Sequence, residues 1–177
     1  MLLQQAIGPS NTNKVKVETE RCGMLSKVTD NLRNCRLFKE LTDEHIKKIA
    51  PAFDVADYKI GDLIFRQGDP GDSVYIIERG LVNLERTVDL GSRQVNVSIS
   101  FLGPHRLLGC WACLFGEIKQ HTESALCQKP TRVVTAKASA LKSILRGDLN
   151  ITIALLIQLC YMLGDKVNGV YNAMESL

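Results

Sequence analysis

The stretch from residue 58 to 85, YKIGDLIFRQGDPGDSVYIIERGLVNLE, constrains the fold more than any other part of the chain. Turn-forming residues interrupt it at Gly61-Asp62, at Gly68-Asp69-Pro70-Gly71 and at Arg79-Gly80. The apolar segments between these turns have the length of strands and carry β-branched residues. Short strands at near-regular spacing predict an antiparallel sandwich, jelly roll or barrel.

Helices are expected on both sides of this strand region, which we place at residues 54–145. Apolar residues recur at helical spacing in 24–53, where Thr42 is a candidate N-cap and Pro51 is expected near a helix end. From residue 148 onward, apolar residues recur at steps of three and four, which predicts one long helix with an apolar seam. The seam consists of Leu156, Leu159, Leu163, Val167, Val170 and Met174.

We therefore expect a mainly β fold with flanking helices (α+β), built as a double-stranded β roll or jelly roll plus a long C-terminal helix. Residues 1–23 are expected to form a flexible leader, 24–147 the roll with its N-terminal helices, and 148–177 the C-terminal helix. A chain of 177 residues with 45% hydrophobic residues is enough for one such domain.

Charge and hydropathy exclude several functions. The net charge of +3 is small and the basic residues are scattered, so we expect no direct binding of nucleic acid. The N-terminus lacks the basic and apolar regions of a signal peptide. The longest apolar run, residues 151–163, is too short to span a bilayer. These features predict a cytoplasmic protein with no membrane segment.

The order of helices, glycine-punctuated roll and long helix resembles the cyclic nucleotide-binding domain family. This family includes the sensor half of Crp/Fnr-type regulators and the regulatory subunits of kinases. The residues that match its pattern are Gly61, Gly68, Asp69, Gly71, Asp72 and Gly80. The resemblance implies a non-enzymatic regulatory or sensor module that signals through its C-terminal helix. It implies weak binding of a cyclic nucleotide, cAMP or cGMP, or of another small ligand.

The resemblance also places a phosphate-binding cassette within residues 102–127, LGPHRLLGCWACLFGEIKQHTESALC. In the family, a glutamate accepts a hydrogen bond from the ribose and an arginine neutralises the phosphate. Aligned without gaps, Cys110 stands on the glutamate and His121 on the arginine, so both charged groups are missing. The candidate ligand-binding positions are Gly109, Cys110, Trp111, Ala112, His121 and Thr122.

A second alignment stays open. The letters FGEI at 115–118 match the cassette literally, and they would make Glu117 the sugar-binding residue and Arg132 the phosphate-binding residue. This alignment needs an insertion before Phe115 and shifts the later segments out of register with the C-terminal helix.

Other chemistry is not indicated. Cys110 and Cys113 form a CxxC motif, but no second pair of cysteines accompanies it. We therefore expect these side chains to pack in the core rather than to bind zinc or carry out redox chemistry, and we expect no metal site. No arrangement of nucleophile, base and orienting residue is recognisable, which argues against an enzyme.

The apolar seam of the C-terminal helix is expected to pack on its own roll or on a second copy of the chain. The resemblance favours a homodimer, because members of the family commonly pair through this helix. Two further interpretations remain. The chain is a ligand-free scaffold for dimerisation or docking, or it is the sensor fragment of a Crp/Fnr-type transcription regulator without its DNA-binding domain.

Overall fold

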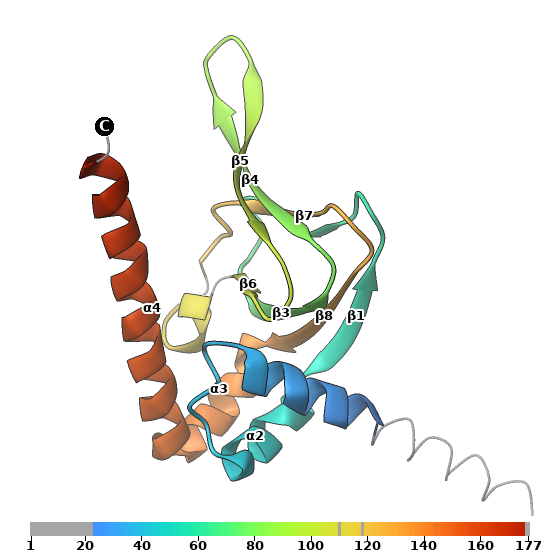
Figure 1. Ribbon diagram of the computed structural model, residues 1–177, viewed down its shortest axis with the longest axis vertical. Helices are drawn as coiled ribbons and strands as arrows, with labels where there is room; N and C mark the ends of the chain where they lie inside the picture. The colour runs from blue at the N-terminus through green and yellow to red at the C-terminus, as the bar shows by residue number, and fades with distance from the viewer. Residues whose placement is uncertain (1–22, 110, 118, 176–177) are drawn as a thin grey trace, which may run out of the picture.

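A computed structural model describes residues 23–109, 111–117 and 119–175 of the chain (Figure 1). A β roll forms the centre, with helices below it and one long helix at its side. The strands are β1 (Asp54–Tyr58), β2 (Leu63–Phe65), β3 (Ser73–Arg79), β4 (Val82–Asp89), β5 (Gln94–Leu102), β6 (Leu107–Gly109), β7 (Ser124–Cys127) and β8 (Thr131–Lys137). The predicted mainly β fold with flanking helices is confirmed.

The strands form two antiparallel four-stranded sheets, in the orders β1-β8-β3-β6 and β2-β7-β4-β5. Apolar residues from both sheets, among them Ile77, Val82 and Val133, pack together inside the roll. The neighbouring residue Val134 belongs instead to the core between roll and helices. Since successive side chains of a strand point to opposite faces, β8 separates these two apolar cores.

The turn residues of the 58–85 stretch have structural roles. Gly80 has φ +112°, and a Cβ there would lie 2.7 Å from the Cα of Thr131, so only glycine fits. The carboxylate of Asp62 accepts a hydrogen bond from the backbone N–H of Lys59, and Asp69 does the same for Arg66. Side chains that close turns in this way specify the fold, whether or not the domain binds a ligand.

The helices lie at one end and one side of the roll. An N-terminal helix covers residues 23–34, followed by α2 (Asp43–Ile49), the 3-10 turns η1 (Ala50–Ala52) and η2 (Trp111–Leu114), α3 (Ala138–Gly147) and α4 (Leu149–Glu175). Thr42 is the N-cap of α2, as predicted, and its Oγ1 accepts from the N–H of His45. The strand region ends earlier than expected, at Lys137, because α3 occupies residues that we had included among the strands.

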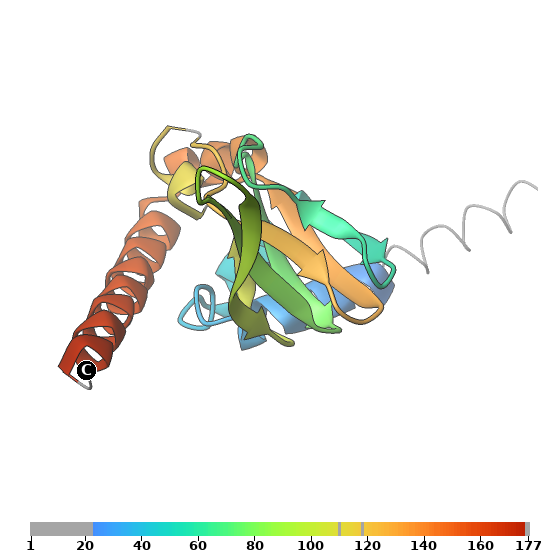
Figure 2. The same ribbon diagram turned by 90° about the horizontal axis from the view of Figure 1, so that it is seen from above.

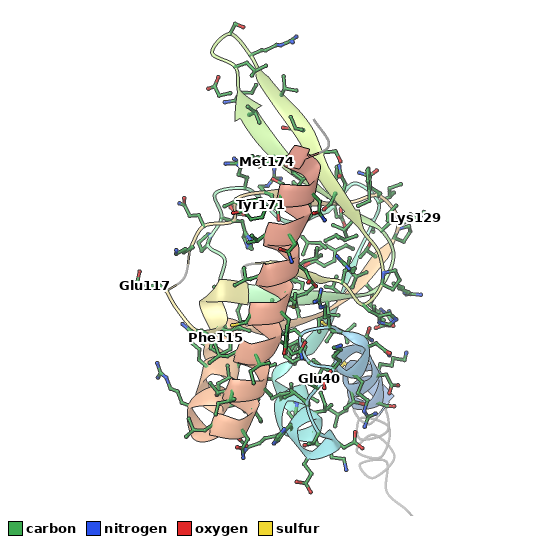
Figure 3. All side chains as sticks on the ribbon, turned by 60° about the vertical axis from the view of Figure 1, so that its left-hand side comes forward. Glu40, Phe115, Glu117, Lys129, Tyr171 and Met174 are labelled. Atoms are coloured by element: carbon green, nitrogen blue, oxygen red, sulfur yellow. The ribbon has the colours of Figure 1, made fainter. Side chains whose placement is uncertain are left out.

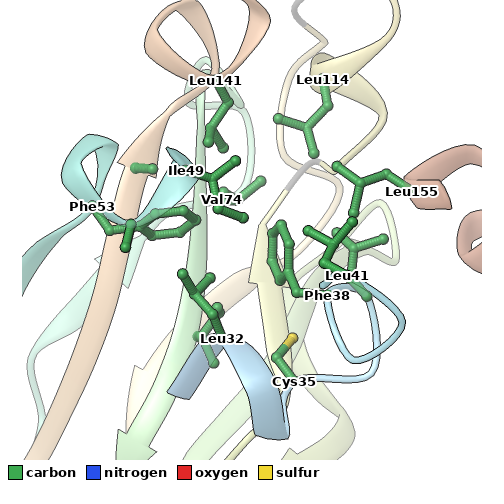
Figure 4. Close-up of a cluster of buried hydrophobic side chains, with 14 of the residues drawn as sticks. Leu32, Cys35, Phe38, Leu41, Ile49, Phe53, Val74, Leu114, Leu141 and Leu155 are labelled. Atoms are coloured by element: carbon green, nitrogen blue, oxygen red, sulfur yellow. The ribbon is translucent and has the colours of Figure 1, made fainter. Parts of the chain in front are cut away.

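A large apolar core joins these helices to the roll (Figure 4). Phe38 is fully buried and packs edge-on against Phe53, with ring centroids 5.9 Å apart. Leu32 from the N-terminal helix, Leu141 from α3 and Leu155 from α4 complete this cluster. The first turns of α4 are therefore fixed to the body of the domain.

The apolar residues of α4 lie on two opposite faces rather than on one seam. Ile151, Leu155 and Leu159 are buried against the domain. Figure 2 shows the C-terminal half of α4 standing clear of the strands. The exposed apolar residues of the helix are Leu149, Ile153, Leu156, Ile157, Tyr161, Leu163, Val167, Tyr171 and Met174. The predicted seam was thus wrong in including Leu159, and the side chain of Val170 lies outside the described residues.

The apolar part of α4 is longer than the run that the sequence suggested. Residues Leu149–Gly169 form 21 helical residues with a mean hydropathy of 1.2, which is long and apolar enough to cross a membrane by length and composition. A buried core helix passes the same test, but only 24% of this segment is buried, at the residues of α4 that face the domain.

Candidate ligand-binding site

A cavity of about 430 Å³ lies between the roll and α4, which is within the size range of small-molecule sites. Its apolar wall includes Leu84 from β4, Leu102 from β5, Leu107 from β6 and Met162 from α4. The remaining lining residues are Cys35, Arg36, Ser100, His105, Arg106, Leu108, Gly109, Glu123 and Asp165. A more open groove of about 490 Å³ lies outside the roll, between residues 36–40 and α4.

Gly109, the first of the predicted ligand-binding positions, lines this cavity. It ends β6 with φ +91°, and a Cβ there would lie 2.7 Å from the carbonyl oxygen of Ser73. The backbone therefore passes close to β3 at the edge of the cavity, and a larger residue would displace it.

Charged groups surround the mouth of the cavity. Arg36, which follows the N-terminal helix, forms an ion pair with Asp165 of α4. This pair joins the body of the domain to the free half of the helix. Glu123 and Arg106 also line the cavity, and neither side chain has a hydrogen-bond or ion-pair partner among the described residues. Burial raises the pKa of the Cys35 thiol to about 11, so this cavity-lining thiol is neutral and a poor nucleophile at pH 7.

His121 is held inside the roll and does not line the cavity. Its ring stacks on Phe65 with centroids 3.8 Å apart, and the residue is only 6% exposed. Its backbone is fixed on the glycine-rich turn, where its carbonyl accepts from Gly68 and its N–H donates to Asp69. Burial lowers the pKa of His121, although Asp69 and Asp72 partly oppose this. The imidazole is therefore neutral at pH 7 and supplies no cation for a phosphate.

The burial of His121 predicts a loss of stability in mild acid. Its folded-state pKa lies below the unfolded value of about 6.5. As the pH falls below that value the unfolded chain takes up the proton first, so stability is present above it and decreases toward the folded-state pKa. Urea unfolding between pH 7.5 and 5 measures this slope. A His121→Gln variant is expected to have a shallower slope, and an equal slope would contradict this assignment.

The other residues of the gap-free alignment are placed only in part. Thr122 is exposed, next to the buried His121. Cys110 lies outside the described residues. Trp111 and Ala112 belong to η2, but their side chains lie outside the described residues too.

The second alignment's two residues lie apart from the cavity. Glu117 is exposed on the loop after η2 and points away from the roll in Figure 3. Arg132 lies on the face of β8 that carries Val134, and its Nε and Nη2 donate to Asp57 of β1 at 2.8 and 2.7 Å. This hydrogen-bonded pair lowers the pKa of Asp57. The guanidinium is thus used in a contact between two strands.

We expect Arg132→Ala to leave the affinity for any ligand of the cavity unchanged within about twofold, because distant sites act independently. Isothermal titration of the variant and the wild type with the same compound measures this. A tenfold loss of affinity would place Arg132 in the site and favour the second alignment.

Sequence reasoning missed the four acidic and arginine residues that line the cavity: Arg36, Arg106, Glu123 and Asp165. They come from four separate segments, so no local motif contains them. One signal was available for Glu123. In the gap-free alignment it stands two residues after His121, where the family pattern has alanine. Glutamate instead of alanine at this position could have indicated that the site is charged differently from the family's.

The two-sheet roll with its flanking helices is the architecture of a regulatory domain family. The chain belongs to the cyclic nucleotide-binding domain family, whose model matches residues 55–148. In the described part of the chain, no group of three or more His, Cys, Asp or Glu side chains could hold a metal ion.

The relatives are regulators of two kinds. The chain is 30% identical over 135 residues to the cGMP-dependent protein kinase egl-4 of Caenorhabditis briggsae, covering 75% of this chain but only 17% of the kinase. Among solved structures, the N-terminal domain of a transcriptional regulator from Streptomyces coelicolor A3(2) is 25% identical with a TM-score of 0.67, covering 79% of this chain and 94% of that one. A cyclic nucleotide-binding domain from Methylobacillus flagellatus shares the fold, at 17% identity and TM-score 0.69, covering 84% and 81%.

Proposed function

We propose that this chain is a non-enzymatic sensor module whose cavity binds a small ligand and whose α4 transmits the occupancy. One observation carries the proposal: the walls of the cavity come from both the roll and α4. Leu102 and Leu108 belong to the roll, whereas Met162 and Asp165 belong to α4, beyond its buried first turns. A ligand that contacts both sides favours one position of α4 over others, which is what a regulatory domain requires.

Cyclic nucleotides are the first compounds to test, and we expect their binding to be weak. Family membership supports them, as do relatives whose structures are described as cAMP-bound, such as the regulatory protein PfPKA-R. The expectation of weakness rests on His121, which is neutral and buried against Phe65 where the family pattern has a cation. A phosphate without a paired guanidinium loses its strongest hydrogen bonds.

We further propose that the signal passes to a second copy of the chain through α4, in the cytoplasm. The exposed residues Leu149, Ile153, Leu156, Leu163, Val167, Tyr171 and Met174, together with Cys160 and Gly164, recur at steps of three or four along the helix, apart from the adjacent pair Leu163 and Gly164. This is the spacing at which two helices pack along a common seam. Gly164 has open space beside it, which allows a close approach.

A second candidate is the sensor part of a Crp/Fnr-type transcription regulator. It is favoured by the similarity to the N-terminal domain of a transcriptional regulator, which the chain covers almost entirely. A third, a ligand-free docking scaffold, keeps α4 as its functional surface and needs no occupied cavity. The first and second candidates both require ligand binding, so a binding test separates them from the third.

Titration with cAMP and cGMP up to 10 mM, followed by thermal unfolding, tests the sensor proposal. We expect a midpoint that rises with ligand concentration, since binding to the folded state stabilises it. Leu102→Trp fills the cavity and should abolish the rise. The matched control is Leu90→Trp, at an exposed leucine of the β4–β5 turn, which should keep it. If neither cyclic nucleotide raises the unfolding midpoint, and if phenylalanine, phenethylamine and 3-phenylpropionate do not raise it either, the ligand-free scaffold replaces the sensor as the proposed function.

A further inference from the structure

Two opposite charges line the cavity without a side-chain partner among the described residues. Glu123, just before β7, is partly buried, and its carboxylate has no hydrogen-bond or ion-pair partner among the described residues. Arg106, just before β6, is exposed at the mouth and likewise has no side-chain partner there. The two line the same cavity without forming an ion pair with each other. By contrast, the other arginine and acid of the cavity, Arg36 and Asp165, are paired.

A partly buried carboxylate without a partner favours a cation beside it. Removing a charge from water costs free energy unless a counter-charge or hydrogen-bond donors replace the water. An ammonium or guanidinium group beside Glu123 would provide both, as a charge-assisted hydrogen bond. The cyclic phosphate of a nucleotide would instead bring a second negative charge to this side of the cavity.

Part of the cavity wall is apolar. Leu84, Leu102, Leu107 and Met162 offer hydrocarbon and thioether surface, and a cavity of about 430 Å³ has room for a molecule of amino-acid size. Arg106, at the mouth, is suited to a carboxylate, with which a guanidinium forms paired hydrogen bonds.

We propose that this cavity takes a small zwitterion with an apolar body, such as an apolar α-amino acid, with its ammonium at Glu123 and its carboxylate at Arg106. This rests on the proposed function, because it names the ligand class of the same sensor site. The proposed site would bind a cationic group, whereas the phosphate cassette of the family binds an anion. The acid Glu123 lines the cavity just before β7.

Three probes that share a phenyl body test the charge preference: phenylalanine (zwitterion), phenethylamine (cation) and 3-phenylpropionate (anion), with cAMP for comparison. Isothermal titration of the full chain should give the order phenylalanine, then phenethylamine, then 3-phenylpropionate. Glu123→Gln should weaken the first two roughly tenfold, the effect of one lost charge-assisted hydrogen bond, and should not weaken the anion. Arg106→Gln should weaken phenylalanine and 3-phenylpropionate but not phenethylamine.

The controls are two exposed residues of like charge that do not line the cavity, Glu44→Gln and Arg86→Gln, which should change no affinity. Tighter binding of 3-phenylpropionate or cAMP than of phenethylamine, unaffected by Glu123→Gln, overturns the zwitterion proposal and leaves the sensor function standing. If the three probes and both cyclic nucleotides all fail to bind, the sensor function falls together with it.

Discussion

Replacing Val167 and Tyr171 with glutamate is expected to convert a dimer of this protein into a monomer. Both residues lie on the exposed seam of α4 and are 50% and 61% exposed in the single chain. Burying a large apolar side chain in an interface contributes about 1.5–3 kcal/mol, and a buried unpaired carboxylate adds a further penalty. The double variant should raise the dissociation constant of the dimer at least a hundredfold, as roughly 3 kcal/mol or more requires.

Sedimentation equilibrium of the wild type and the double variant measures this. The control is Ile60→Glu, which changes an apolar residue that is 68% exposed in the turn between β1 and β2, away from the seam. It should leave the association unchanged. A wild type that stays monomeric at all attainable concentrations would contradict the dimer proposal. Equal dissociation constants for wild type and double variant would place the interface elsewhere.

Gly80→Ala is expected to lower the free energy of unfolding by about 3 kcal/mol or more. The added Cβ would combine the strain of positive φ with an overlap on the backbone of Thr131 in β8. Gly61 is a matched control, because it also has positive φ (+83°) but has nothing within 4 Å of the built Cβ. Gly61→Ala should cost only about 1–2 kcal/mol, the strain alone.

Urea unfolding of the two variants gives the comparison directly. Equal losses would show that conformational strain dominates at both glycines and that the contact with Thr131 is easily relieved. A larger loss at Gly80 would support the structural role of the glycine pattern, which carries the resemblance to the family and requires no ligand.

The fold could be predicted from the sequence because its signals are local. Gly61, Gly68 and Gly80 all have positive φ. Each of their turns can be recognised from the residue types within the turn itself. The capping of α2 by Thr42 is local as well. The strand pattern alone missed α3, since a strand of seven residues runs directly into it without a glycine or proline between them, although the gap-free alignment with the family placed Leu141 on a short helix.

The site could be predicted less well because its chemistry depends on which face of an element a residue occupies. FGEI matches the cassette literally, yet Glu117 is exposed on a loop and Arg132 lies on the face of β8 turned away from the roll interior. A shift of one residue along a strand moves a side chain to the other face of the sheet. The local sequence does not show which face the side chain occupies. The sequence also did not reveal that His121 stacks on Phe65, a residue 56 positions away in the chain.

Methyl NMR of Met162 tests the central claim most directly. This residue belongs to α4 and lines the cavity, whereas Met24, in the N-terminal helix, lies outside it. In ¹³C-methyl-methionine protein, we predict that phenylalanine or a cyclic nucleotide shifts the Met162 signal in a saturable way and leaves Met24 unchanged. Leu102→Trp should remove the shift. If the Met162 signal stays unmoved by all of these compounds at 10 mM, the account of α4 as the moving wall of a ligand site is contradicted.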